Sequence, residues 1–203
     1  MSGALPEPGA RIFCVGRNYR EHAREMGAPE TGRPVLFLKP ASACCAPGPA
    51  RLPTGHGRVD FEGELVFELS GDPRDPVRGA ALGVDLTLRD LQGELKQQGL
   101  PWDSAKGFDG SALLGPRVPV PTDETAALEF RLWVNDQLRQ QGRAQEMRRP
   151  PRDLVAAIAA YWEPRAGDLL FSGTPAGVGP LQPGDEISMD SPQLGSAAWQ
   201  LQA

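Results

Sequence analysis

Three carboxylates in the first half of the chain have a spacing that could hold a metal ion. Glu62 and Glu64 are two residues apart in an alternating segment, so both side chains would project from one face of a strand. Asp85 ends a second short apolar segment, a place from which side chains commonly project into a site. Three carboxylates without a histidine or thiol suit a hard divalent cation. The same spacing also fits the wet face of an edge strand, and spacing alone favours that simpler interpretation.

A histidine and a glutamate could form a second chemical group, a general base with its orienting partner. His22 and Glu25 are three residues apart, which places them on one face of a helix. A carboxylate beside an imidazole raises its basicity and fixes its tautomer, as activation of water requires. An exposed helix with ordinary charge spacing explains the pair equally well, and from these residues alone it is the stronger interpretation.

Composition and charge exclude several classes of protein. The 203 residues carry a net charge of -5, so no basic field is available for nucleic acid. No apolar run has the length of a membrane span, and the N-terminal segment lacks the pattern of a signal peptide. Three cysteines, two of them adjacent, build neither a disulfide framework nor a zinc site. We therefore expect a cytoplasmic enzyme that binds neither nucleic acid nor membranes.

The elements that must position these groups are mostly strands. The 24 glycines and 21 prolines are scattered between apolar runs, which is typical of a β-rich fold with many turns. Alternation or apolar runs predict strands at 11–15, 34–39, 61–69, 80–85 and 128–134, the last followed by a hairpin turn at Asn135-Asp136. Helices are predicted at 18–26, from Thr87 to a stop at Gly99, and at 153–162, whereas 41–59 reads as a long loop. We expect one domain spanning 1–203.

Several blocks occur together in an order that is more specific than any of them alone. They are CVGRNYREHAREMG (14–27), PVLFLKP (34–40), DFEGEL (60–65), GVDLTLRDLQ (83–92), GLPWDSAKGFDG (99–110) and LLFSGTPAGVGP (169–180). In these blocks the chain resembles the fumarylacetoacetate hydrolase family, in particular its short single-domain members with acylpyruvate hydrolase or oxaloacetate decarboxylase activity. The resemblance implies a β-rich α+β fold, a mixed β-sandwich roll of the type of the family's C-terminal domain with a few short helices. It also implies a homodimer.

The resemblance assigns roles to individual residues. Glu62, Glu64 and Asp85 match the family's metal ligands, which implies Mg²⁺ with Mn²⁺ as the alternative. His22 and Glu25 match its catalytic dyad, on a lid helix at 18–27, and Lys106 matches its active-site lysine. The expected substrate-binding residues are Arg17, Arg89, Gln92 and Thr174. Phe37 and Lys39 match a segment that packs beside the site. The chain departs from the family pattern at Ala144 and at Arg148-Arg149-Pro150-Pro151, where a charged loop could suit a second substrate carboxylate.

The implied reaction is metal-dependent hydrolysis of a carbon–carbon bond in a 2,4-dioxo acid, such as acetylpyruvate or fumarylpyruvate. His22, oriented by Glu25, would activate water, and Lys106 would stabilise negative charge on oxygen while pyruvate leaves as its enolate. The same enolate chemistry serves oxaloacetate decarboxylation or keto–enol tautomerisation, so these remain alternatives. A non-catalytic metal-binding β domain is a more remote one, because it has no use for the dyad and the lysine.

Overall fold

The structure is a computed structural model, and it describes residues 5–21 and 32–203. His22, Glu25 and most of the predicted lid helix at 18–27 lie outside the described residues. Arg20 and Glu21 are helical.

Strands dominate the described part of the chain, as the sequence predicts. They are β1 (Ile12–Gly16), β2 (Val35–Lys39), β3 (Cys44–Cys45), β4 (Gly48–Arg51), β5 (Val59–Phe61), β6 (Gly63–Leu69), β7 (Val77–Asp85), β8 (Thr87–Leu88), β9 (Ala112–Leu114), β10 (Val118–Pro119), β11 (Glu129–Val134), β12 (Gln137–Arg143), β13 (Leu169–Phe171), β14 (Gly179–Leu181), β15 (Glu186–Ser191) and β16 (Gly195–Gln202). The helices are α2 (Arg89–Gln98), α3 (Asp103–Lys106) and α4 (Pro151–Ala159), with short 3-10 helices η1 (Ala41–Ala43), η2 (Thr122–Ala127) and η3 (Ala144–Glu146).

The described strands form one large curled sheet and two smaller ones. The eight-stranded sheet has the order β2-β1-β13-β6-β7-β9-β3, with β10 paired to β7. A five-stranded sheet has the order β12-β11-β15-β16-β4, and β14, β5 and β8 form a three-stranded sheet. The β1–β13 pairing is parallel and the β6–β7 pairing antiparallel, so the large sheet is mixed. These features confirm the predicted β-rich sandwich roll with few helices.

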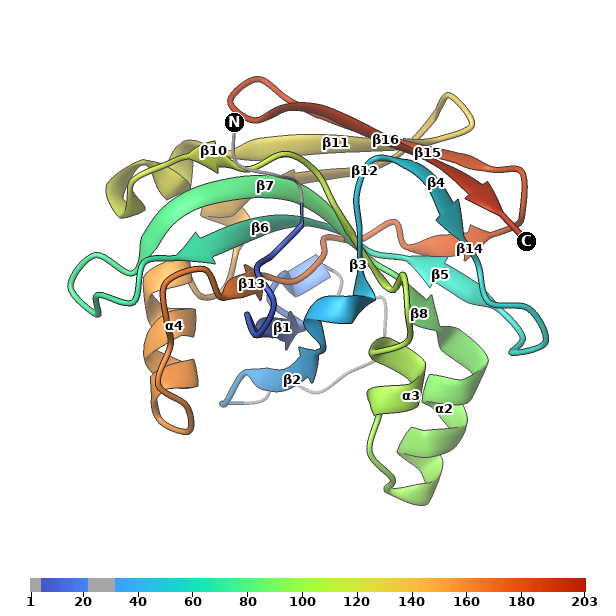
Figure 1. Cartoon of the computed structure of the whole chain (residues 1–203), viewed down its shortest axis with the longest axis horizontal. Coiled ribbons are helices and arrows are strands. Elements are labelled where there is room, and N and C mark those ends of the chain that lie inside the picture. The colour runs from blue at the N-terminus through green and yellow to red at the C-terminus, as the bar shows by residue number, and fades with distance from the viewer. Residues whose placement is uncertain (1–4, 22–31) are drawn as a thin grey trace.

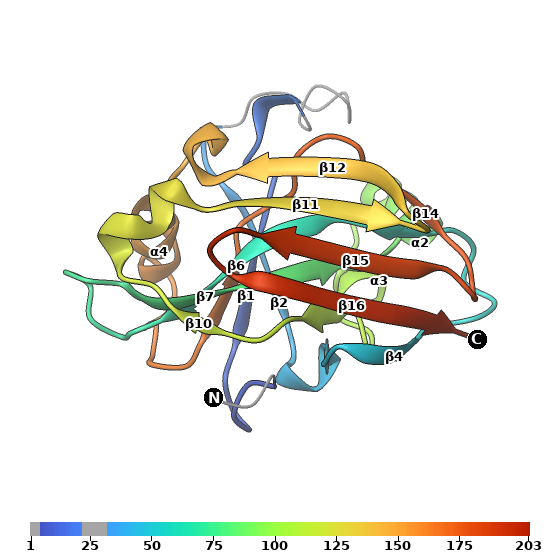
Figure 2. The same cartoon turned by 90° about the horizontal axis from the view of Figure 1, so that it is seen from above.

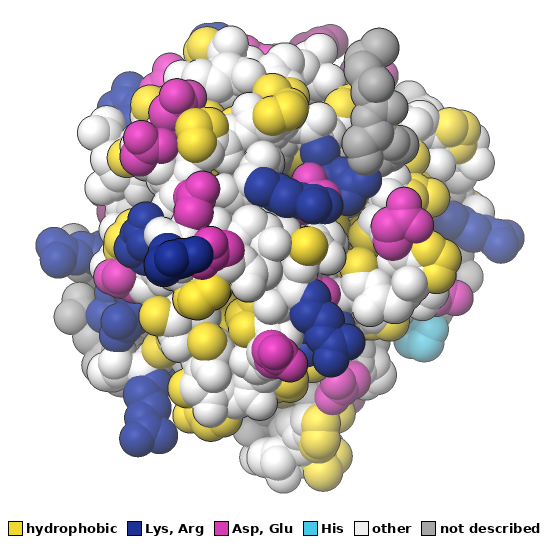
Figure 3. Space-filling model, turned by 60° about the vertical axis from the view of Figure 1, so that its left-hand side comes forward, with side chains coloured by type: hydrophobic (Ala, Val, Ile, Leu, Met, Phe, Trp, Pro, Cys, Tyr) yellow, Lys and Arg dark blue, Asp and Glu magenta, His cyan; other side chains and the backbone are white. Residues whose placement is uncertain are grey.

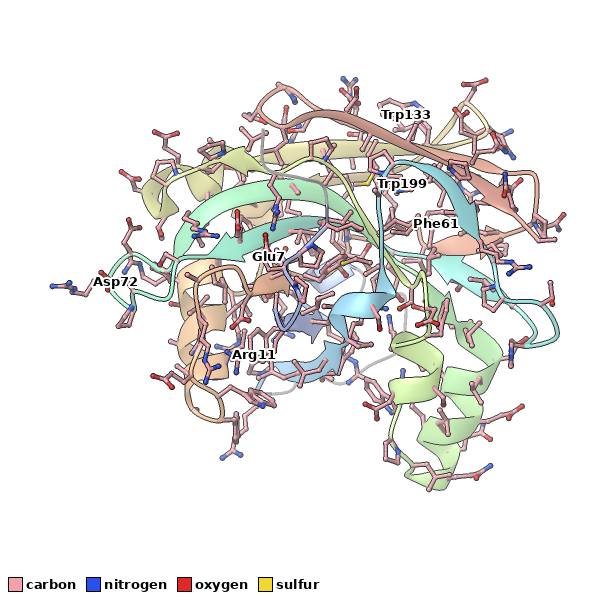
Figure 4. The ribbon with its side chains drawn as sticks, viewed as in Figure 1. Glu7, Arg11, Phe61, Asp72, Trp133 and Trp199 are labelled. Atoms are coloured by element: carbon pink, nitrogen blue, oxygen red, sulfur yellow. The ribbon has the colours of Figure 1, made fainter. Side chains whose placement is uncertain are left out.

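The main core lies between the five-stranded sheet and strands β6 and β7 (Figures 1 and 2). On β11 the residues alternate, so Phe130 and Leu132 are buried while the Trp133 ring is half-buried on the other face. Trp199 from β16 and Phe61 from β5 are fully buried in the same core, and Figure 4 shows them between the two layers. Burial of such large side chains supplies most of the free energy that holds the layers together.

Local chemistry explains several boundaries. Helix α2 ends at Gly99, whose φ of 67° is left-handed, as expected for a residue that closes a helix. Asn135 and Asp136 have φ values of 49° and 62°, which fit a two-residue hairpin turn between β11 and β12. Pro151 lies in the first turn of α4, where its missing N–H costs nothing.

Two sequence expectations are wrong. The stretch 41–59 is not one loop, because β3 pairs with β9 and β4 pairs with β16, both in parallel. The predicted strand 61–69 divides at Glu62, and its two parts, β5 and β6, belong to different sheets. The division leaves the period-two pattern unchanged, so the sequence could not reveal it.

On the face drawn in Figure 3, basic and acidic side chains are interspersed among apolar ones. In residues 5–21 and 32–203 we find no helix long and apolar enough to cross a membrane.

Candidate functional site

Glu62, Glu64 and Asp85 lie together inside the molecule. One carboxylate oxygen from each lies within 4.8 Å of those from the other two. All three residues are buried: Glu62 is 7% exposed, Glu64 2% and Asp85 1%. Strand β6 lies between β13 and β7 and is therefore not an edge strand. The interpretation of these glutamates as a wet strand face is thus wrong.

Sheet register brings the three carboxylates together. Strands β6 and β7 are antiparallel, with Gly63 opposite Val84 and Glu64 opposite Gly83. The Asp85 N–H donates to the Glu62 carbonyl oxygen at 2.8 Å, which continues the ladder past the end of β6. Gly83 provides room on this face, since a Cβ there would lie 2.6 Å from a Val66 methyl carbon. The site therefore rests on the paired strands β6 and β7.

Two buried lysines contact the carboxylates. Lys106, at the end of α3, places Nζ 2.9 Å from both Glu62 Oε2 and Asp85 Oδ2, and it donates to the Thr87 hydroxyl at 2.6 Å. Lys39 ends β2 and lies 2.9 Å from Asp85 Oδ1, while its ammonium also donates to the Lys106 carbonyl. Burial alone would lower the pKa of Lys106, but the charges of Asp85 and Glu62 outweigh it and raise that pKa. The neighbouring carboxylates thus favour the charged form of Lys106, which donates hydrogen bonds to them.

Glu64 is the carboxylate that these cations compensate least. Within residues 5–21 and 32–203 no ion pair joins it to a basic side chain, and its Oε2 accepts the Gly173 N–H at 2.7 Å. Burial first, and then the charges of Asp85 and Glu62, raise its pKa well above the usual value. A bound dication would relieve this repulsion, and oxygen atoms are the ligands that hard dications prefer. The residues present therefore fit a divalent metal.

Arg89 connects the carboxylate cluster to helix α2. Its guanidinium contacts Glu62 Oε1 at 2.5 Å and Asp60 Oδ2 at 2.8 Å, and it donates to Gln92 Oε1 at 2.8 Å. Asp60 is itself buried, and Arg58 also pairs with it. Charge-assisted bonds of this kind hold Arg89 and Gln92 in fixed positions at the first turn of α2.

A pocket of about 70 Å³ opens beside the cluster, and basic residues surround it. Among its lining residues are Glu62, Asp85, Lys106, Arg17, Arg89, Gln92, Lys96 and Trp102. Arg17 has a left-handed backbone with φ of 64°, which is uncommon for a residue with a side chain and typical of functional sites. Lys96 lies over the Trp102 ring at 4.9 Å, and partial burial, followed by the charges of Arg17 and Arg89, lowers its pKa. The pocket thus brings four cationic side chains, Arg17, Arg89, Lys96 and Lys106, beside two of the carboxylates.

Thr174 lies next to the backbone that separates two of the carboxylates. It is not among the residues that line this pocket, and its hydroxyl donates to the Gly63 carbonyl oxygen at 2.8 Å. Gln140 on β12 contacts the same glycine, donating to Thr174 Oγ1 at 2.8 Å and accepting the Gly63 N–H at 2.9 Å. The predicted contact between Thr174 and substrate stays a prediction.

The segment that departs from the family pattern also lies away from the pocket. The Arg148 N–H donates to the Asn18 carbonyl oxygen, and Asn18 Oδ1 accepts the Arg149 N–H. Arg148 lines a separate hollow of about 520 Å³ with Tyr19 and Arg20, whereas Ala144 is buried. Among the described residues, none of the four at 148–151 lines the pocket beside the carboxylates, so the suggested contact with a second substrate carboxylate stays a prediction.

Sequence reasoning missed several residues that shape the site. Lys96, Asp60 and Gln140 were not predicted, and Lys39 was expected only in a segment that packs beside the site, although it contacts Asp85 directly. A lysine at the end of the apolar run PVLFLK was the one available signal, since a charge in a buried strand needs a partner.

Comparison with known proteins agrees with this geometry. The model of the fumarylacetoacetate (FAA) hydrolase C-terminal family matches residues 11–202. Oxaloacetate tautomerase YcgM of Escherichia coli K12 is 38% identical over 199 residues, covering 92% of this chain and 91% of that protein. The mitochondrial oxaloacetate tautomerase FAHD1 of Mus musculus is 38% identical over 195 residues, covering 89% and 86%.

A crystal structure carries the comparison to a bound metal. Fumarylpyruvate hydrolase from Pseudomonas aeruginosa, in complex with Mn²⁺ and pyruvate, superposes with a TM-score of 0.85 at 33% identity, covering 95% of this chain and 89% of that one. A family match over nearly the whole sequence and relatives of this identity leave one conclusion: the chain belongs to the fumarylacetoacetate hydrolase family.

Proposed function

We propose that the protein catalyses the keto–enol tautomerisation of oxaloacetate, using a divalent metal held by Glu62, Glu64 and Asp85. The observation that carries the proposal is the buried carboxylate cluster at the base of a small cationic pocket. Two relatives at 38% identity are named oxaloacetate tautomerases, which favours this reaction over the acylpyruvate hydrolysis that the sequence suggested first. Mg²⁺ is the proposed ion and Mn²⁺ the alternative, since both accept carboxylate ligands.

The chain's own residues supply binding and charge stabilisation. Arg17, Arg89 and Lys96 line the pocket and offer cationic partners for the two carboxylates of oxaloacetate. The charges of Asp85 and Glu62 raise the pKa of Lys106, so its ammonium serves as a donor to the 2-oxo oxygen as negative charge develops there, rather than as the base. When bound, a divalent cation supplies Lewis-acid polarisation of the 2-oxo acid group.

Tautomerisation also needs a group that takes a proton from C3 of the keto form while the 2-oxo oxygen gains one, and that returns a proton to C3 in the reverse direction. His22, oriented by Glu25, is the proposed base, on grounds of sequence resemblance alone. Both lie outside the described residues. A short described segment, Arg17 to Glu21, joins them to the pocket.

The test starts from enol oxaloacetate and follows the loss of its enol absorbance, with pyruvate measured in the same samples. We expect the protein to accelerate the loss with Mg²⁺ or Mn²⁺, without forming pyruvate, and to lose the effect in EDTA. Lys106→Met should lower kcat by about 10²- to 10³-fold, the usual cost of one oxyanion donor. Gln141→Met on the exposed side of β12 is the matched control. Stoichiometric pyruvate would indicate a decarboxylase instead, and the absence of any acceleration would contradict the proposal.

Hydrolysis of an acylpyruvate is the second candidate, supported by the structural likeness to a fumarylpyruvate hydrolase. Its carbon–carbon cleavage needs an activated water, which tautomerisation does not. Acetylpyruvate and fumarylpyruvate should therefore be assayed beside oxaloacetate, with pyruvate as the readout. A higher kcat/KM for either one would make hydrolysis the main activity.

Two further expectations belong to this proposal. A homodimer follows from the sequence resemblance, and sedimentation velocity would test it. The described cysteines Cys14, Cys44 and Cys45 are all free thiols, which agrees with a reducing compartment such as the cytoplasm.

A further inference from the structure

The backbone N–H and carbonyl of Gly63, between two of the proposed metal ligands, both bond side chains from other parts of the chain. Its N–H donates to Gln140 Oε1 at 2.9 Å, and its carbonyl oxygen accepts the Thr174 hydroxyl at 2.8 Å. Both groups face away from β7, because the Glu62 carbonyl on the other edge accepts the Asp85 N–H. Strand β13 pairs with β6 only at Val66, Phe67 and Glu68, so it does not reach Gly63. Side chains thus replace a missing strand partner.

The side-chain amide of Gln140 can make these hydrogen bonds in only one of its two flipped orientations. Its Oε1 must accept from a backbone N–H, while Nε2 donates to Thr174 Oγ1 at 2.8 Å and to the Pro175 carbonyl at 2.9 Å. The side chain is buried, so each of these bonds is shielded from water. Gln140, Gly63 and Thr174 form a closed ring of hydrogen bonds, and every polar atom of the Gln140 side chain is used.

The space over Gly63 is too small for any side chain. A Cβ at this position would lie 2.7 Å from a Leu132 methyl carbon, 3.0 Å from Gln140 Oε1 and 3.2 Å from the Phe130 ring. Side chains of β11 and β12 therefore pack closely over the backbone that separates Glu62 from Glu64. The direction of each carboxylate depends on this one backbone unit.

We propose that Gln140 is a positioning residue, which fixes the Gly63 peptide and thereby sets the spacing of the Glu62 and Glu64 carboxylates for a divalent ion. The inference rests on the proposed metal site. Gln140 itself contacts no carboxylate in the described structure; it acts through the backbone. Groups that orient metal ligands in this way commonly affect metal affinity by about 10- to 100-fold.

The test compares Gln140→Met and Gln140→Asn with the control Gln141→Met. Methionine keeps the length of glutamine but removes all three hydrogen bonds, and asparagine keeps the amide one methylene short of its partners. Gln141 is the exposed neighbour on the same strand. Mn²⁺ binding is measured by calorimetry, and hydrogen exchange at Gly63 is measured by mass spectrometry on metal-free protein.

We expect both Gln140 variants to bind Mn²⁺ about 10- to 100-fold more weakly and to exchange the Gly63 amide faster, with Gln141→Met unchanged. A folded Gln140 variant that is less stable but binds Mn²⁺ like the wild type would overturn the inference, since its role would then be structural only. If Gln140→Met does not fold, Gln140→Asn decides between these results. A wild-type protein that binds no Mn²⁺ would overturn the proposed metal site as well, which separates the two failures.

Discussion

Replacing Lys106 by methionine removes a buried ammonium group but keeps a side chain of similar length. In the metal-free protein this ammonium contacts Glu62, Asp85 and the Thr87 hydroxyl. Without it, two buried carboxylates lose a shared cation, and removing one partner from such a cluster typically costs about 3–5 kcal/mol. For a chain of this size that loss corresponds to a drop in Tm of roughly 6–20 °C. We expect it in EDTA, by calorimetry.

The same variant behaves differently when metal is present. A divalent cation replaces the positive charge that Lys106 provided to Glu62 and Asp85. In the wild type the ammonium, 2.9 Å from both carboxylates, repels that cation, and in the variant this repulsion is absent. Free Mn²⁺ at about 100 times its Kd stabilises any binder by about 2.7 kcal/mol. The variant, which should bind more tightly, gains more than the wild type. Its stability deficit therefore shrinks in Mn²⁺.

The control is Lys96→Met, the same substitution at the rim of the same pocket. Its side chain reaches solvent, so we expect a change in the free energy of unfolding within about 1 kcal/mol. A Lys106→Met deficit no larger than that of the control, or one of equal size in EDTA and Mn²⁺, would refute the reasoning. The first result would mean that the ammonium is not needed to offset the carboxylates, and the second that no metal shares its role.

Three further outcomes are expected. The pKa of Glu64 is raised and a metal ligand must be ionised, so Mn²⁺ binding should release protons and become stronger as pH rises toward that pKa. Titration calorimetry in buffers of different ionisation enthalpy measures the proton release and the affinity at each pH. An affinity that does not change with pH would contradict the prediction. Gly63→Ala should destabilise the protein by about 1–3 kcal/mol and weaken Mn²⁺ binding, because the added carbon meets Leu132; urea unfolding with parallel binding isotherms tests both. Asp168 is neither in the carboxylate cluster nor in the lining of the pocket, and Asp168→Ala removes four hydrogen bonds from Arg11 and Arg165. We expect it to lower the free energy of unfolding in urea by about 3 kcal/mol and to leave Mn²⁺ affinity unchanged, and a changed affinity would contradict this.

Much of the site could be predicted because its chemistry is local in the sequence. Glu64 lies in β6, Glu62 directly precedes that strand and Asp85 ends the next one, so all three carboxylates come from neighbouring positions of one strand pair. Arg89 and Gln92 are three residues apart on one helix, and the structure joins them by a hydrogen bond. What spacing could not decide was whether the glutamates face water. Burial depends on β13 and β1, which pair from distant parts of the chain.

The residues that were missed depend on packing between layers. Gln140 belongs to a strand, QLRQQGR, without an apolar pattern, so nothing in the sequence separates it from the exposed Gln141. It is buried because β12 lies against β6, a contact between sheets that no local rule predicts. Strands β3 and β4 were missed for a related reason. They are short, rich in small residues and stabilised by parallel partners far along the chain.

The register of β6 against β7 has a consequence for how activity is lost. A slip of one residue would turn Glu64 away from Asp85 and move Leu65 and Phe67 out of the core, so such a slip would disrupt the core and the carboxylate cluster together. The cations, by contrast, arrive from α2, α3 and β2. Fraying of α2 and α3 would therefore leave an acidic cavity in an otherwise native sheet, a state that captures divalent ions avidly but has lost the groups that recognise a substrate.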